Sequence, residues 1–165
     1  MRRMLLLFVS LLLVSSIAVA DHIGIFSDAT GSSCLLPAGF TTTCAVVHRY
    51  SLGATASRWY IDSSSLIGAV FAFSTSYTTT GSFDNILSVG YGTCLTGTFP
   101  LGTLIMATTS GWLSIKGFPG VIYTDCNLVE HSATAGRACV GCGADPCPIL
   151  AAEPSTWGRV KSLYR

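Results

Sequence analysis

The chain has 165 residues, half of them hydrophobic and only 10% charged, with a formal net charge of +1. Without the first 20 residues, which are mostly apolar, the chain carries seven Lys or Arg and eight Asp or Glu, a net charge of −1. This balance excludes the basic surface of a nucleic-acid-binding protein and a strongly acidic, solvating tail. The remaining length suits one domain with its own core.

Residues 1–20 have the layout of a secretory signal peptide. Arg2 and Arg3 give a positive start, an apolar run follows from Leu5 to Ile17, and a small-x-small cleavage site ends at Ala20. A transmembrane anchor is the alternative, but the apolar run is shorter than the roughly 20 residues needed to span a bilayer. We therefore expect cleavage after Ala20. The mature protein is then secreted, periplasmic or at the cell surface, with no transmembrane segment.

Residues 21–140 carry the pattern of a β domain. Short runs rich in β-branched and aromatic residues alternate with Gly, Ser and Asp-Asn breaks, and no long helical period occurs. The predicted strands are 22–27, 43–50, 56–62, 70–75, 86–91, 101–108, 112–115, 121–125 and 128–132. Eight or nine such strands predict an all-β, antiparallel two-sheet sandwich of immunoglobulin-like or cohesin-like type, with a closed barrel as the alternative.

The composition changes at the C-terminal end. Residues 141–155 are rich in Pro and Gly and predict a linker. Residues 156–165 predict a short amphipathic helix, with its cations opposite an apolar face. That face consists of Trp157, Val160, Leu163 and Tyr164. Because so short a helix is marginal alone, we expect this tail to dock on its own domain, on a partner or on a membrane surface.

Seven cysteines follow the predicted signal peptide and are all disulfide candidates: Cys34, Cys44, Cys94, Cys126, Cys139, Cys142 and Cys147. Export places them in an oxidising compartment, and an odd number leaves one thiol over. Local spacing suggests a bridge between Cys34 and Cys44. A second bridge between Cys94 and Cys126 would staple neighbouring strands. The other three cysteines would then supply one bridge and the spare thiol.

A metal site is an alternative use of the last cysteines. The pattern H-x7-C-x2-C-x4-C could hold zinc in a Cys3His site. Its ligands would be His131, Cys139, Cys142 and Cys147. The CxxC spacing could also form a redox pair, although the surrounding Gly and Pro residues oppose the helix that a thioredoxin-type pair needs. We favour structural disulfides, with no metal and no cofactor.

Motifs for catalysis are missing from the sequence. It has no G-x-S-x-G elbow, P-loop, G-x-G-x-x-G, H-E-x-x-H or EF-hand loop. A triad could be assembled from one of three histidines, an aspartate and one of many serines, so such a set has little meaning. The aromatic residues of the predicted strands could form a sugar-stacking face, but core packing is the commoner role. These aromatic residues are Trp59, Tyr60, Phe71, Phe73 and Trp112. We therefore expect no catalytic residues.

Three segments, 22–34, 53–61 and 156–165, resemble uncharacterised exported proteins of environmental bacteria. In those proteins a cysteine-containing β domain follows the signal, and a short Trp-Gly tail ends the chain. The resemblance implies export, a β fold and a tail used for docking or sorting. It brings no catalytic residues.

The sequence thus predicts a non-catalytic, secreted or cell-surface β-sandwich that acts as a binding, adhesion or structural module and is stabilised by disulfides. Its expected partner is a protein or glycan at the cell surface, and not a nucleic acid. The alternative is a small extracellular metal-binding protein or hydrolase that uses the His131/Cys139/Cys142/Cys147 cluster.

Overall fold

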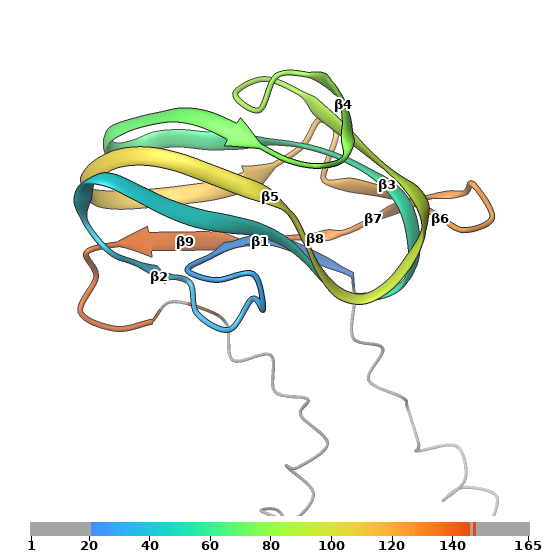
Figure 1. Ribbon diagram of the computed structural model, residues 1–165, viewed down its shortest axis with the longest axis horizontal. Helices are drawn as coiled ribbons and strands as arrows, with labels where there is room; N and C mark the ends of the chain where they lie inside the picture. The colour runs from blue at the N-terminus through green and yellow to red at the C-terminus, as the bar shows by residue number, and fades with distance from the viewer. Residues whose placement is uncertain (1–20, 146, 148–165) are drawn as a thin grey trace, which may run out of the picture. The chain divides into compact units, whose positions relative to one another are not determined.

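The computed structural model describes residues 21–145 and 147, which belong to one compact unit. Every helix or strand element in this part of the chain is a β-strand, so the predicted all-β class is confirmed (Figure 1). Among the described residues, no helix has the length and apolar character needed to cross a bilayer. The predicted signal peptide, 1–20, and the predicted helix of Trp157, Val160, Leu163 and Tyr164 lie outside the described residues.

Two of the strands are far longer than the sequence pattern predicts. The strands in chain order are β1 (His22–Phe26), β2 (Leu35–Leu36), β3 (Gly39–Ser74), β4 (Thr78–Gly81), β5 (Leu87–Lys116), β6 (Ile122–Asp125), β7 (Glu130–Ser132), β8 (Thr134–Ala135) and β9 (Arg137–Val140). Three predicted strands merge in β3 and three in β5, while β2, β4, β8 and β9 are short strands that were not predicted. Glycines interpreted as breaks are bends instead: Gly53 and Gly68 in β3 have φ of 149° and 148°, and Gly111 in β5 has 122°.

The long strands fold the sheet into a sandwich. At about 3.3 Å per residue, β3 would measure roughly 120 Å if straight, whereas a domain of this size has a radius of gyration of only about 14 Å. Strands β3 and β5 therefore bend, with register shifts at several points of their antiparallel ladder, and pass between the layers (Figure 1). Hydrogen bonds consequently join all nine strands in the order β2-β9-β5-β3-β1-β8, with β4 on β5, β6 on β3 and β7 on β6.

The core lies between the layers and is aliphatic and aromatic. In β3, Ser57, Trp59 and Ile61 are buried, whereas the residues between them are partly exposed. This alternation is the period of two of a strand with one buried face, as expected for the predicted strand 56–62. Trp59 is fully buried, and the Phe73 ring packs edge-on against it at 5.5 Å. The predicted aromatic set is therefore divided, because Phe71 is 62% exposed and lies outside the core.

Candidate functional site

Six of the seven cysteines form three disulfides. They are Cys34–Cys147, Cys94–Cys126 and Cys139–Cys142, with Cα–Cα distances of 5.0, 5.4 and 5.8 Å. The suggested Cys34–Cys44 bridge is wrong. The parallel pairing of β2 with β9 brings Cys34 beside the chain that follows β9, whereas Cys44 points into the core as a free thiol. The structure joins Cys94 to Cys126, which is the pairing that strand spacing suggested.

The proposed zinc ligands do not come together in the structure. Cys139 and Cys142 are bonded to each other, and Cys147 is bonded to Cys34. A sulfur held in a disulfide cannot serve as a thiolate ligand. His131 instead lies on β7, with its Nε2 2.9 Å from Asp125 Oδ2. The oxidised chain therefore offers no Cys3His set. Asp145 lies close to the Cys34–Cys147 disulfide, but that bond likewise occupies both sulfurs.

A buried polar pair lies at the start of β1. His48 of β3 is fully buried, with its Nε2 2.9 Å from Asp21 Oδ1 and its Nδ1 3.3 Å from the Tyr91 hydroxyl. Burial lowers the pKa of His48, although the Asp21 carboxylate acts in the opposite direction. The rings of Tyr91, Phe99 and Tyr123 enclose the His48 imidazole at 5.2 to 6.3 Å. No substrate can reach this pair without opening the core, so its role is to hold β1 in place.

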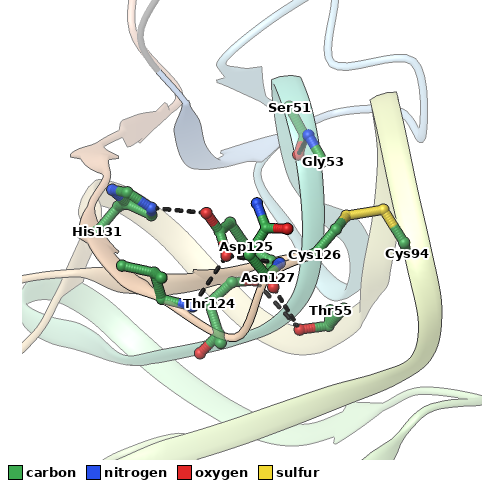
Figure 2. A network of polar contacts seen from close by, with 10 residues as sticks. Ser51, Gly53, Thr55, Cys94, Thr124, Asp125, Cys126, Asn127 and His131 are labelled. Atoms are coloured by element: carbon green, nitrogen blue, oxygen red, sulfur yellow. Dashed lines mark hydrogen bonds and ion pairs between the residues drawn. A yellow bond between two sulfur atoms is a disulfide. The ribbon is translucent and has the colours of Figure 1, made fainter.

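A second Asp–His pair is exposed on the β6–β7 hairpin (Figure 2). Asp125 Oδ1 accepts hydrogen bonds of 2.8 Å from the backbone N–H groups of Asn127 and Val129, while Oδ2 bonds His131. The Val129 N–H, then His131 and then the Asn127 N–H lower the pKa of Asp125. The His131 ring stacks on Tyr123 at 5.2 Å.

This exposed pair could transfer a proton, but it has no nucleophile. Among the described residues, no hydroxyl or thiol is hydrogen-bonded to the His131 ring. The nearby Thr55 hydroxyl donates to the backbone carbonyls of Thr124 and Asp125, at 3.3 and 3.1 Å (Figure 2). The hydrogen bonds of Asp125 close the turn of the hairpin, and the neighbouring Cys94–Cys126 disulfide ties the hairpin to β5. We assign the pair a structural role.

One solvent-facing side of the sheet combines cations and aromatic rings. Residues that pair directly across neighbouring strands point to the same side of the sheet. The pairs Arg58–Ile122 and Tyr60–Lys116 point to the solvent side, away from the buried residues of β3. Ser114 pairs with Asp62 on one side and with Arg137 on the other, so Arg137 points to this side as well. Trp112 does too, because it lies two residues from Ser114 on β5. We call this surface the Arg58–Arg137 face. It consists of Arg58, Tyr60, Asp62, Trp112, Ser114, Lys116, Ile122, Glu130 and Arg137.

The charges of this face differ from those of the rest of the domain. The described residues include seven Asp or Glu but only four Lys or Arg, and three of those four cations lie on the Arg58–Arg137 face. Lys116 forms an ion pair with Asp62 and, with the hydrogen bonds from Ser64, lowers the pKa of that carboxyl to about 2. Arg58 lies 4.0 Å from Glu130. The Arg137 guanidinium lies 4.5 Å above the Trp112 ring.

An apolar groove adjoins the Arg58–Arg137 face. It has a volume of about 520 Å³ and is lined by Ala38, Gly39, Phe40, Ile67, Gly68, Ala107, Thr108 and Thr109. Phe40 is 97% exposed and Ile67 is 66% exposed. Ile67 pairs with Ser110, two residues along the ladder from the pair of Ser65 with Trp112, so the groove wall and the Trp112 ring share one face. The sequence reasoning missed both the groove and its two exposed apolar residues.

No protein-family model matches the chain, and no curated protein matches it. Among solved structures, the chain is similar to a cohesin module from a family 33 glycoside hydrolase of Clostridium perfringens. The TM-score is 0.51 at 9% identity, and the match covers 73% of this chain and 95% of that chain. The fold is cohesin-like. The sandwich is therefore the cohesin-like member of the two predicted types.

Two further cohesin structures match with lower scores. A non-cellulosomal cohesin from the archaeon Archaeoglobus fulgidus has a TM-score of 0.49 at 13% identity, and the match covers 74% of this chain and 91% of that chain. A chain of a type I cohesin–dockerin complex from Clostridium thermocellum has a TM-score of 0.44 at 15% identity, covering 73% and 99%. At these identities the comparisons concern the fold and carry no residue of a binding site to this chain.

Proposed function

We propose that this protein is an exported, non-catalytic binding module that holds a protein partner through the Arg58–Arg137 face. The observation that carries this proposal is the gathering of three of the four described cations, with Trp112 and Tyr60, on one outer sheet face of an otherwise acidic domain. Trp, Tyr and Arg are the side chains that contribute most to protein interfaces. The likeness to a cohesin module supports a modular role.

The ion pairs within the Arg58–Arg137 face can be replaced by ion pairs with a partner. The side chains of Arg58 and Lys116 are 41% and 52% exposed. Exposed pairs contribute at most about 1 kcal/mol, so they open readily. Their cations can then pair with carboxylates of an incoming acidic surface, which also accelerates association. A protein partner is favoured over a glycan because Arg137 covers one face of the Trp112 ring and leaves less of it for stacking on a sugar.

Other observations support the non-catalytic and exported parts of the proposal. The Asp21–His48 pair contacts the Tyr91 hydroxyl but is buried with it, and no hydroxyl or thiol of the described residues is hydrogen-bonded to the exposed His131. Three disulfides suit an oxidising compartment, as does the sequence pattern of residues 1–20.

Charge reversal on the face tests the proposal. The full chain, produced with its first 20 residues so that processing can occur, is used to isolate a binding protein from the envelope and medium of its source cells. Lys116→Glu should weaken the affinity at least tenfold, and less so at high salt. The matched control is Thr96→Glu with Thr98→Glu, which changes the charge equally at exposed positions of β5. Equal losses in both variants, capture of a polysaccharide, or no binding protein at all would overturn the proposal.

A further inference from the structure

We propose that the apolar groove and Arg137 together hold an extended acidic segment of the protein partner. An apolar side chain of the segment enters the groove, and a carboxylate a few residues away binds the Arg137 guanidinium. This inference rests on the proposed function and specifies the chemistry of the partner at one end of the Arg58–Arg137 face.

The groove is shaped to take an apolar side chain. Its rim carries the exposed rings and methyl groups of Phe40 and Ile67, and small residues such as Gly68 and Ala107 line it. A Cβ at Gly68 would lie 2.2 Å from the Ala107 carbonyl oxygen, so the close approach of the two strands here requires glycine. No charged residue lines the groove. A volume of about 520 Å³ accommodates one large apolar side chain with its flanking backbone.

Arg137 provides the charge complement. Its guanidinium is held over the Trp112 ring at 4.5 Å, and no carboxylate of the described residues lies within ion-pair distance of it. The other two cations of the face already have such partners, Asp62 and Glu130. A stacked guanidinium keeps its N–H donors available in a fixed plane, which suits a bidentate carboxylate. The unmatched charge therefore calls for an acidic group on the partner.

The distance between the two features sets the length of the segment. Trp112 and Thr109 are three residues apart on β5, which corresponds to at most roughly 10 Å of strand because β5 bends at Gly111 between them. An extended peptide covers that distance with three or four residues, whereas the same residues in a helix would advance only about 5 Å. The proposed segment is extended, with Asp or Glu three or four positions from a large apolar residue.

A peptide selection tests this inference. A phage-displayed library of random twelve-residue peptides is selected on the full chain, and the consensus peptide is synthesised and its affinity measured. We expect an apolar residue and an acidic residue three or four positions apart. Ile67→Ser and Arg137→Gln should each weaken this peptide at least tenfold, while the exposed control Thr96→Gln stays within twofold. Replacing the acidic residue of the peptide by its amide should add no further loss in Arg137→Gln.

A different occupant of the apolar groove would change the outcome of these experiments. A consensus without an acidic residue, no enrichment, or peptide binding that both substitutions leave unchanged would overturn the inference. So would a wild-type chain that dimerises in solution through Phe40, since the groove would then hold a second copy. Circular dichroism and thermal unfolding of Ile67→Ser confirm that the variant is folded. If the isolated partner still distinguishes Lys116→Glu from its control while the groove variants bind normally, this inference fails and the proposed function stands.

Discussion

Asp21 and His48 form a buried pair in which Asp21 Oδ1 lies 2.9 Å from His48 Nε2. Asp21 directly follows the predicted cleavage site, and its backbone carbonyl also accepts a 2.8 Å hydrogen bond from the N–H of Thr134. The side chain of this residue thus ties the start of β1 to β3, and its backbone ties it to β8. Cleavage after Ala20 stays a prediction, but it would leave as first residue one that is fixed at two points.

Loss of the Asp21 carboxylate should destabilise the fold. In Asp21→Ala the buried His48 Nε2 loses its partner, and an unsatisfied buried polar group costs roughly 1–3 kcal/mol. Urea unfolding of the full chain measures this loss. The matched control is Asp84→Ala, since Asp84 is exposed and bonds only its neighbour Ser82. We expect that control to remain within about 0.5 kcal/mol of the wild type. A similar loss in both variants would contradict a special role for the Asp21–His48 pair.

Acid should weaken the fold through His22. This residue is 3% exposed, and its Nδ1 has no hydrogen-bond partner among the described residues. Burial first, and then the charges of Arg49 and His48, lower the pKa of His22 from 6.5 to about 4. Between these pH values the unfolded chain binds a proton that the folded chain does not, so stability present above pH 6.5 is lost as the pH falls toward 4. The loss has an upper limit of roughly 3 kcal/mol.

Unfolding at a series of pH values measures that loss. His22→Gln should flatten the slope between pH 6.5 and 4, leaving the part that the buried His48 contributes in the same direction. The control Thr96→Gln, at an exposed position without an ionisable side chain, should keep the slope of the wild type. An unchanged slope in His22→Gln would show that His22 does not carry this pH dependence.

The three disulfides should differ in their contributions to stability. Their sequence separations are 113 for Cys34–Cys147, 32 for Cys94–Cys126 and 3 for Cys139–Cys142. Because loop-closure entropy grows with the logarithm of loop length, replacing each pair by serine should cost roughly 5, 4 and under 2 kcal/mol in that order, as upper limits. Denaturant unfolding of the three double variants, without reductant, gives the ranking. If the Cys139–Cys142 variant lost the most free energy of unfolding, that result would contradict this entropic account.

The oxidised chain should show one thiol, and only after denaturation. The free Cys44 is buried, and burial raises its pKa to about 12, so alkylating reagents find no accessible thiolate in the folded protein. The non-reduced mass should lie about 6 Da below that of the reduced chain because of the three disulfides. Mass spectrometry after alkylation, with and without guanidinium, checks both values. Several thiols that become reactive on chelation would instead support the zinc alternative.

The sequence pattern was informative where local chemistry decides the outcome and uninformative where distant segments meet. The alternation in residues 56–62 correctly separated Ser57, Trp59 and Ile61 from Arg58 and Tyr60, because side-chain direction in a strand follows from the period of two. The partner of Cys34 was not predictable, since it depends on the parallel pairing of β2 with β9, across more than 100 residues. The groove required knowledge of where Phe40 and Ile67 meet, which no local pattern contains.

Glycines mark the clearest limit of the sequence interpretation, and Gly68 offers a direct test of it. This residue lies in the gap between the predicted strands 56–62 and 70–75, but it continues the β3 ladder with φ of 148°. In Gly68→Ala the new Cβ meets the Ala107 carbonyl oxygen and the Thr108 backbone, and the backbone conformation disfavours any L side chain. We expect a loss of roughly 1–3 kcal/mol in urea unfolding. Gly120→Ala is the control, because no atom lies within 4 Å of its Cβ, and it should stay within about 0.5 kcal/mol of the wild type. If Gly68→Ala is as stable as that control, the β3 ladder is interrupted at Gly68. The close approach of Gly68 and Ala107 would then not shape the apolar groove.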